Sequence, residues 1–167
     1  VEELKFEPEG RQVFVLGAGG AATAIVMYLG SSVKKISVYD VDSGKTGALK
    51  SRFEDHYGKE KIEIVGPGDI KAAIALSQLL VNATPLGMKE GDPLPVDPSF
   101  FVPGLYVYDL VYNRPVTDLV KEASRRKLHA VTGLGMLLYQ GATAFEIWTG
   151  KKAPVGVMKR ALKEALK

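Results

Sequence analysis

A glycine-rich loop at residues 17–22, "GAGGAA", constrains the fold of this chain more than any other stretch. It follows the apolar run "RQVFVLG" and precedes a run of helix formers without proline. Gly17 permits a tight turn, Gly19 lets a pyrophosphate approach the backbone, and Ala22 lets the helix pack closely on the strand. The first turn of that helix would offer free N–H groups to an anion. The pattern therefore predicts a dinucleotide site on Gly17, Ala18, Gly19, Gly20 and Ala21.

An acid ends the second apolar run, "KKISVYD", about twenty residues after Gly17, which is the spacing expected of a residue that binds the adenosine ribose. A carboxylate at Asp40 would accept hydrogen bonds from both ribose hydroxyls and repel the 2′-phosphate of NADP, so it favours NAD. Asp42 is better explained as an acid at the start of a helix. Lys45 is the nearby cation that could still attract a phosphate. The alternative to a dinucleotide site is a glycine-rich turn and a solvent-exposed strand end that bind no ligand.

Apolar, β-branched segments alternate with helix-forming segments along the rest of the chain. This alternation predicts an α/β fold with a doubly wound, mostly parallel sheet, which is a Rossmann-like nucleotide-binding domain, followed by two C-terminal helices. The predicted strands span residues 11–17, 34–40, 61–65, 78–84, 105–112 and 128–133. The predicted helices span residues 20–30, 43–57, 69–76, 115–127, 134–148 and 154–166, with Ser43 and Asp69 as expected N-caps and Pro115 in the first turn of the fourth.

Three parts are expected along the chain. Residues 1–10 are polar and read as a linker, residues 11–133 form the dinucleotide-binding domain, and residues 134–167 form the closing helices. The segment 85–104 is rich in proline and glycine, so it is predicted to be a long loop without regular structure.

Composition excludes several classes of function. The chain has no cysteine, which rules out disulfides, thiolate metal sites and cysteine nucleophiles and fits a reducing cytoplasm. His56 and His129 stand apart from each other and from paired carboxylates, so no metal site is expected. The net charge is +3 with dispersed lysines and arginines, and the cluster at residues 125–127 reads as a solvated helix end rather than a nucleic-acid surface. No apolar run is long enough to cross a bilayer.

Three further motifs make the chain similar to a known family. They are "NATPLGM" at residues 82–88, "YDLVYNRPVTDLV" at 108–120 and "GLGMLLYQGATAFEIWTG" at 133–150. Together with the glycine loop, in this order, they resemble the C-terminal nucleotide-binding domain of the shikimate/quinate dehydrogenase family. The resemblance implies a cytoplasmic oxidoreductase of aromatic amino acid biosynthesis. It would pass hydride between NAD or NADP and a polyhydroxylated ring carboxylate such as shikimate or quinate.

The resemblance also implies roles for particular residues. Positions that lie beside the nicotinamide in the family correspond to Asn82, Ala83, Thr84, Met88, Leu110, Gly133 and Met136. Positions that contact the substrate correspond to Tyr112 and Gln140. From the residues alone, Tyr112 could equally be an aromatic at a strand end, Gln140 a polar residue on a helix surface, and the two methionines packing residues.

Two departures from the family pattern stand out. NADP-using members carry Asn-Arg-Thr after the second strand, whereas this chain has Asp40, Val41 and Asp42, which is similar to the NAD-using branch. The family's catalytic lysine and aspartate belong to a substrate domain that precedes the glycine loop. The sixteen residues before Gly17 contain Lys5 and no aspartate, so no catalytic residue is assigned in this chain.

A missing substrate domain has two expected consequences. The chain alone would bind nucleotide but turn over little or not at all, and a non-catalytic nucleotide-binding regulatory module is the alternative function. An apolar face of the closing helices, with Leu137, Leu138, Phe145 and Trp148, could be left uncovered and promote self-association. Packing of these side chains within the chain is the competing expectation.

Overall fold

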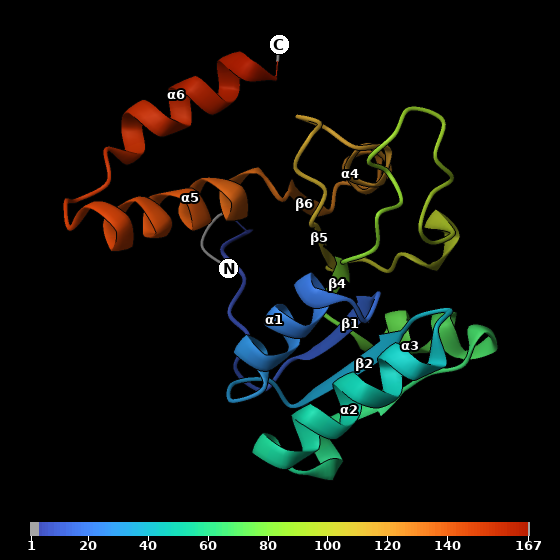
Figure 1. Cartoon of the computed structure of the whole chain (residues 1–167). Helices are drawn as coiled ribbons and strands as arrows, with labels where there is room; N and C mark the ends of the chain where they lie inside the picture. Colours follow the sequence, from blue (N-terminus) through green and yellow to red (C-terminus); the bar gives the residue numbers. More distant parts are fainter. Residues whose placement is uncertain (1–3, 167) are drawn as a thin grey trace.

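The computed structural model describes residues 4–166 of the chain (Figure 1). Within them, six parallel strands form one sheet in the order β3-β2-β1-β4-β5-β6, and helices cover both faces. The predicted α/β, doubly wound fold is confirmed. The strands are β1 Gln12–Leu16, β2 Lys35–Tyr39, β3 Ile62–Ile64, β4 Leu79–Asn82, β5 Tyr106–Asp109 and β6 His129–Thr132.

The helices agree closely with the expected segments. They are α1 Gly20–Leu29, α2 Ser43–Tyr57, α3 Ile70–Leu76, α4 Asp118–Arg125, α5 Leu134–Thr149 and α6 Val155–Ala165. Three short 3-10 turns, Lys59–Lys61, Pro67–Asp69 and Pro98–Phe100, complete the described elements. The last of these is the one regular piece inside the predicted loop 85–104.

The strand order places one end of the sheet where ligands bind in folds of this kind. The chain builds outward from β1 to β2 and β3, then returns to β4 on the other side of β1. Leu16 pairs with both Tyr39 and Asn82, and Asn82 pairs in turn with Asp109. The carboxyl ends of four strands therefore meet at one edge, at the point where the order reverses.

The core has two layers because successive side chains of a strand point to opposite faces. Val13 and Val15 belong to the layer under α1 and α2, whereas Phe14 and Leu16 belong to the layer under α3 and α4. Each of these four side chains is at most 2% exposed. Since both faces are covered, β1 reads in sequence as a continuous apolar run rather than as an alternating one.

The start of α2 differs from the expectation. Asp42, not Ser43, is the N-cap, and its Oδ1 accepts hydrogen bonds from the N–H groups of Gly44 (3.0 Å) and Lys45 (3.2 Å). The backbone of Asp42 is extended, as a capping residue requires, and Ser43 is already helical. The interpretation of Asp42 as a helix-start acid is confirmed.

Two other helix starts differ in part from the expectation: the fourth helix begins later than predicted, whereas Asp69 is at the N-cap position of α3 as predicted but makes no side-chain cap. The fourth helix begins after Thr117, whose hydroxyl accepts the N–H of Val120 at 3.3 Å, so Pro115 lies outside it. Asp69 precedes α3 but ends a 3-10 turn with φ −99° and ψ −5°. In that conformation its side chain makes no capping hydrogen bond within the described part of the chain.

The segment expected to be a linker is packed in its described part. Leu4 and Phe6 are 4% and 5% exposed and belong to the core layer under α1. The ring of Phe6 also meets Tyr106 of β5, with ring centroids 5.3 Å apart. Residues 1–3 lie outside the described residues, and the division into three parts stays a prediction.

Candidate nucleotide-binding site

The glycine loop lies against the end of β4. Gly17 has a φ of +99°, and a Cβ built on it would lie 2.8 Å from the carbonyl oxygen of Ala83. Its N–H donates to the carbonyl oxygen of Tyr39 at 2.7 Å. Only glycine permits both this backbone conformation and this approach, so Gly17 brings β1, β2 and the loop after β4 together.

The start of α1 is open. Gly19 is the N-cap and makes no side-chain cap, and Gly19, Gly20 and Ala21 are all exposed. A Cβ on Gly19 would meet no atom within 4 Å. The first N–H groups of the helix and its positive dipole end therefore face open space, which is the arrangement that holds a pyrophosphate.

A cavity of about 300 Å³ begins at this helix end. The loop after β4, the turn after β5 and the first turn of α5 supply the other walls. Most of the sequence-predicted residues meet here. The lining is Gly19, Gly20, Ala21, Ala83, Thr84, Pro85, Met88, Leu110, Val111, Tyr112 and Met136.

Asp40 sits beside the glycine loop, as its spacing predicted. Its Oδ2 accepts the N–H of Ala18 at 2.7 Å, and its Oδ1 accepts the N–H of Asp42 at 2.9 Å. The carboxylate thus ties the tip of β2 to the loop. A carboxylate has about four acceptor positions, so two remain for the hydroxyls of a ribose.

A smaller cavity of about 190 Å³ lies between the glycine loop and α2. Ala18 and Thr23 line one side, and Lys45, Ala48, Leu49 and Arg52 of α2 line the other. Lys45 is near the capping acid Asp42, with Nζ and Oδ2 3.6 Å apart. The hydrogen bond from Lys45 N–H lowers the pKa of Asp42, so this acid stays charged and offsets the lysine.

Asn82 does not face the cavity. It is 0% exposed, and its amide group makes four hydrogen bonds. Oδ1 accepts from the N–H (3.1 Å) and hydroxyl (2.7 Å) of Thr84, while Nδ2 donates to Leu86 O (3.2 Å) and to Asp109 Oδ1 (2.8 Å). Both donors and both acceptor positions are used, so its side chain shapes the loop 82–88 rather than offering a contact to a ligand.

Asp109 is a buried acid behind the cavity, and the sequence predicted no role for it. It ends β5 at 0% exposure and accepts hydrogen bonds from Asn82, from the Thr117 hydroxyl (Oγ1 to Oδ2, 2.6 Å) and from Val111 N–H (3.2 Å). Burial raises the pKa of Asp109 above its ordinary value of 3.8, and these three hydrogen bonds oppose the rise. Like Asp40, it is an acid at the tip of an apolar strand, a signal present in the sequence but not used.

The turn after β5 and the start of α5 meet through their backbones. A Cβ on Gly133 would lie 2.3 Å from Leu110 O, and Gly133 N–H donates to Val111 O at 2.9 Å. Leu110 is 6% exposed and Tyr112 is 40% exposed, so the tyrosine reaches the open side. Gly133 is thus needed for this backbone packing, independently of its predicted position beside the nicotinamide.

Gln140 does not line the cavity at the glycine loop. It lines a groove of about 800 Å³ between α1 and α5, which shares Met136 with the smaller cavity. Ile25 and Tyr28 form the opposite wall of this groove. The structure therefore brings Gln140 to a neighbouring hollow, whereas Tyr112 lines the cavity at the glycine loop. The roles of all these residues toward ligands stay predictions.

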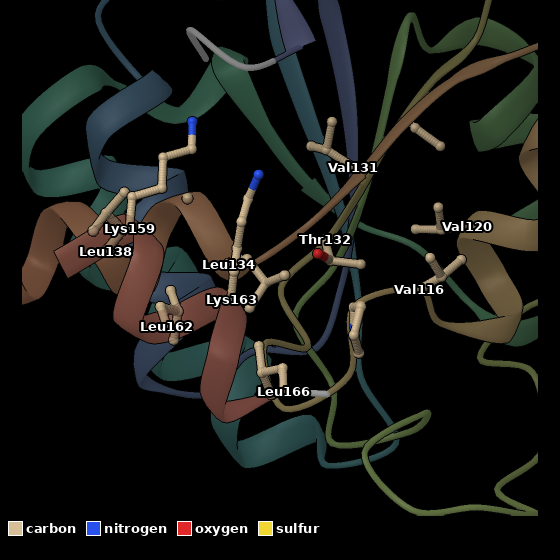
Figure 2. Close-up of a pocket in the computed structure, with 13 residues that line it drawn as sticks. Val116, Val120, Val131, Thr132, Leu134, Leu138, Lys159, Leu162, Lys163 and Leu166 are labelled. Atoms are coloured by element: carbon tan, nitrogen blue, oxygen red, sulfur yellow. The ribbon is translucent and has the colours of Figure 1, made fainter. Parts of the chain in front are cut away.

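A fourth hollow, of about 550 Å³, lies away from the glycine loop (Figure 2). Residues of α5 and α6, including Leu138 and Leu162, line one side, and residues around β6 and α4 line the other. Lys159 and Lys163 are the charged residues in its lining. None of the residues expected to bind the cofactor or the substrate lines it.

Within residues 4–166, no group of three or more acidic, histidine or cysteine side chains could hold a metal ion. In the same span, no helix is long and apolar enough to cross a membrane.

Comparison with known proteins agrees with the motifs. The family model for the C-terminal domain of shikimate 5′-dehydrogenase matches residues 133–163. The shikimate dehydrogenase (NADP(+)) of Moorella thermoacetica is 40% identical in an alignment that covers 99% of this chain and 57% of that protein.

Solved structures give the same picture. Shikimate 5-dehydrogenase from Listeria monocytogenes, in complex with shikimate and NAD, has a TM-score of 0.84 at 33% identity, covering 96% of this chain and 58% of that one. Quinate dehydrogenase from Corynebacterium glutamicum, in complex with NAD, has a TM-score of 0.85 at 30% identity, covering 92% and 55%. This chain spans a little over half the length of these relatives. It is therefore related over nearly its whole length to the shikimate dehydrogenases, and it corresponds to their C-terminal, nucleotide-binding part.

Proposed function

We propose that this chain is the NAD(P)-binding domain of a shikimate/quinate 5-dehydrogenase-type oxidoreductase. Hydride would pass between the nicotinamide and a ring hydroxyl or ketone of shikimate, quinate or the dehydro form. The observation that carries the proposal is the 300 Å³ cavity at the start of α1, where the glycine loop, the loop 82–88, the turn 110–112 and Met136 converge.

The residues present fit a dinucleotide. The open N–H groups at Gly19, Gly20 and Ala21 suit the pyrophosphate, and the missing Cβ at Gly19 lets it approach. A bound nicotinamide dinucleotide supplies the hydride chemistry. The apolar side chains of Leu110 and Met136 line the far part of the cavity, where they would orient the nicotinamide ring and exclude water from it.

The substrate would lie on the open side of the same cavity. Tyr112, at 40% exposure, and the exposed Gln140 can give neutral hydrogen bonds to a ring that carries several hydroxyls. No acid–base pair is assigned in this chain for the proton that accompanies the hydride. The chain alone would therefore bind nucleotide and provide one wall of the substrate site, with little or no turnover.

NAD would be preferred over NADP. Asp40 accepts hydrogen bonds from two backbone N–H groups and has acceptor positions left for two ribose hydroxyls. The 2′-phosphate of NADP would instead be repelled by the negative charge of this carboxylate. Lys45 and Arg52 line the adjoining cavity and favour a phosphate, but Asp42 offsets the lysine. The relative from Moorella thermoacetica is named for NADP(+), so the preference is a property proposed for this chain.

Titration calorimetry of the chain with NAD, NADP and ADP-ribose tests the proposal. NAD should bind more tightly than NADP. Gly19→Ala should weaken all three nucleotides by at least about tenfold, because the methyl group occupies the space of the pyrophosphate. Gly47→Ala is the matched control, since a Cβ there also meets no atom within 4 Å but lies on α2, away from the cavity. Undetectable binding of every nucleotide to the unchanged chain would overturn the proposal.

Two further predictions accompany this function. Self-association through α5 and α6 is supported by the exposure of Trp148 (83%) and Ile147 (74%), whereas Leu138 is buried at 6%. A cytoplasmic location is supported by the absence of cysteine from the sequence.

A further inference from the structure

Asp109 is the centre of a buried polar network that the proposed function does not use. Its two carboxylate oxygens accept hydrogen bonds from Asn82, Val111 and Thr117, at 2.8, 3.2 and 2.6 Å between the heavy atoms. These donors come from three segments: the end of β4, the turn after β5 and the N-cap of α4. A fully buried carboxylate is costly to desolvate, and hydrogen bonds from all sides offset that cost only while the segments keep this arrangement.

Two walls of the cavity are attached to this carboxylate. Through Asn82, it reaches Thr84 and hence the loop 82–88, which supplies Ala83, Thr84 and Met88. Through Val111 N–H, it fixes the turn that supplies Leu110 and Tyr112.

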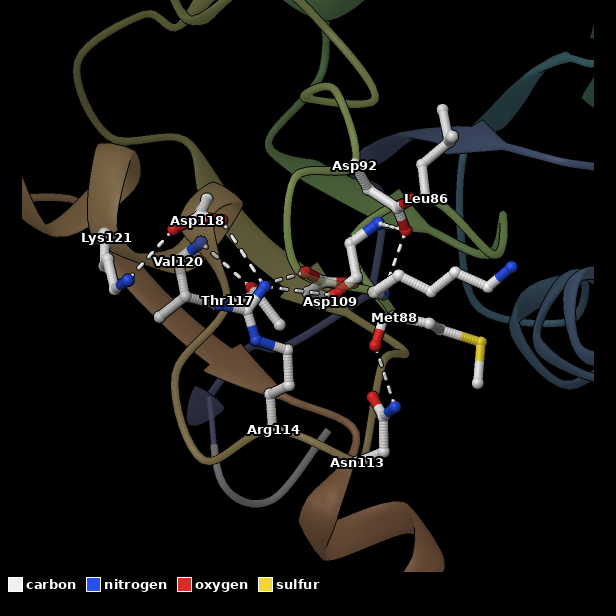
Figure 3. A network of polar contacts seen from close by, with 12 residues as sticks. Leu86, Met88, Asp92, Asp109, Asn113, Arg114, Thr117, Asp118, Val120 and Lys121 are labelled. Atoms are coloured by element: carbon white, nitrogen blue, oxygen red, sulfur yellow. Dashed lines mark hydrogen bonds and ion pairs between the residues drawn. The ribbon is translucent and has the colours of Figure 1, made fainter.

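An outer layer of contacts joins the same two walls (Figure 3). Asn113 Nδ2 donates to Met88 O at 2.9 Å, and Arg114 Nη1 donates to Gly87 O at 3.4 Å. Arg114 also pairs with Asp118 of α4 at 3.4 Å. Asn113 is exposed and Arg114 and Asp118 are partly exposed, so these contacts face solvent, unlike those of Asp109.

We propose that Asp109 is a positioning residue, which holds the loop 82–88 and the turn 110–112 in the arrangement that receives the nicotinamide half of the cofactor. The inference rests on the proposed function and assigns a different carboxylate to each half of the cofactor. Asp40 fixes the glycine loop for the adenosine half, and Asp109 fixes the two loops for the nicotinamide half. Loops that are already ordered need not lose conformational entropy on binding, which strengthens affinity for the part of the ligand that they contact.

The test compares two ligands that share one half. NAD carries the nicotinamide ring into the site, whereas ADP-ribose keeps the adenosine, the pyrophosphate and the second ribose but lacks that ring. We expect Asp109→Asn to weaken NAD binding by about tenfold, equal to about 1.4 kcal/mol, and to leave ADP-ribose binding within about twofold of the unchanged chain. Asp55→Asn, which removes an exposed acid of α2 that lines neither the cavity at the glycine loop nor the one beside α2, should leave both affinities unchanged.

Thr117 provides a second pair of variants should Asp109→Asn fail to fold. Thr117→Val removes the hydroxyl that donates to Asp109 and should weaken NAD but not ADP-ribose. Thr117→Ser keeps the hydroxyl and should restore NAD binding. A role in folding alone would not separate the two ligands.

Equal affinity of the unchanged chain and the Asp109 variant for NAD would overturn the positioning role alone. Equal loss of NAD and ADP-ribose would also overturn it, because the damage would then not be confined to the nicotinamide side. If the unchanged chain binds neither NAD nor NADP, the proposed function fails first and this inference fails with it.

Discussion

The carboxyl edge of the sheet and the C-terminal helix pair use their residues in different ways. At the edge, the backbones approach so closely that no Cβ fits at Gly17 or Gly133, and Asp40 and Asp109 are held by backbone and side-chain donors. In α6, no described residue is buried, and Trp148 at the end of α5 is 83% exposed. The edge combines close backbone contacts and fixed carboxylates with an adjoining cavity, whereas the helix pair leaves apolar surface uncovered.

The largest expected effect comes from filling the tight backbone contact at the edge. Gly133→Ala should destabilise the chain by about 2–4 kcal/mol, because its Cβ would lie 2.3 Å from the Leu110 carbonyl oxygen and the backbone must shift. Gly141→Ala, within α5, should stabilise it by about 0.5–1 kcal/mol through helix propensity, since its Cβ meets only Met158 Cε at an ordinary 3.5 Å. Urea unfolding followed by circular dichroism measures both.

If the two variants have similar stability, the contrast between the edge and the helix pair is wrong, because the turn after β5 would be free to move away from Gly133.

Cofactor choice should depend on one carboxylate at the edge. Asp40→Asn should shift the ratio of the NADP and NAD affinities toward NADP by about tenfold, because it removes one charge from the place of the 2′-phosphate. Asp42→Asn is the comparison variant: it removes the same charge two residues away and keeps a good N-capping side chain. Because it also removes the acid that offsets Lys45, it should shift the ratio toward NADP by less than Asp40→Asn does. Calorimetry with both nucleotides gives the ratio.

An equal shift in both variants would assign the effect to general charge rather than to the position of Asp40. If neither variant shifts the ratio of the two affinities, Lys45 and Arg52, which line the adjoining cavity, would determine which cofactor binds.

Two acids should give opposite pH dependences of stability. Burial raises the pKa of Asp109, so its contribution is fully present below 3.8 and is lost as the pH rises through its raised value. Hydrogen bonding from Lys121 lowers the pKa of Asp118, so its contribution is present above 3.8 and is lost as the pH falls. The quantity to follow is the free energy of unfolding of each variant minus that of the unchanged chain. This difference should rise with pH for Asp109→Asn and fall with pH for Asp118→Asn.

The slope for a single proton cannot exceed about 1.4 kcal/mol per pH unit, and solvent should reduce it for Asp118. Urea titrations from about pH 2 to about pH 7 measure the two slopes, and slopes of the same sign would contradict the assignment of burial as the dominant influence on Asp109.

The smallest effect on stability is expected at an exposed position of the helix pair. Trp148→Ser should change the free energy of unfolding by less than about 0.5 kcal/mol, because the side chain is largely in water. It should nevertheless lower the sedimentation coefficient at high concentration if this face promotes self-association. Leu138→Ala, at a buried position of the same helix, should instead cost about 2–3 kcal/mol. A monomeric unchanged chain at high concentration would contradict the self-association.

The strongest sequence predictions concerned local patterns with a fixed geometry. The glycine loop and the spacing of Asp40 can be read from residue order, because a tight turn, an open helix end and a strand tip are local features. Alternation of apolar and helix-forming segments likewise predicted the sheet and its helices. The helix starts were harder to predict: Asp42 and Ser43 are both good capping residues, and only the backbone conformation shows that Asp42 caps α2.

By itself, the sequence determined the fold class, the place of the glycine loop and the identity of the acid beside it. The tertiary structure decided what Asn82, Asp109 and Gly133 do. Asn82 and Asp109 are separated along the chain but paired across β4 and β5, and Gly133 faces the Leu110 backbone. The physical reason is that hydrogen-bond partners and backbone clearance depend on strand register and packing, which residue types in order do not specify.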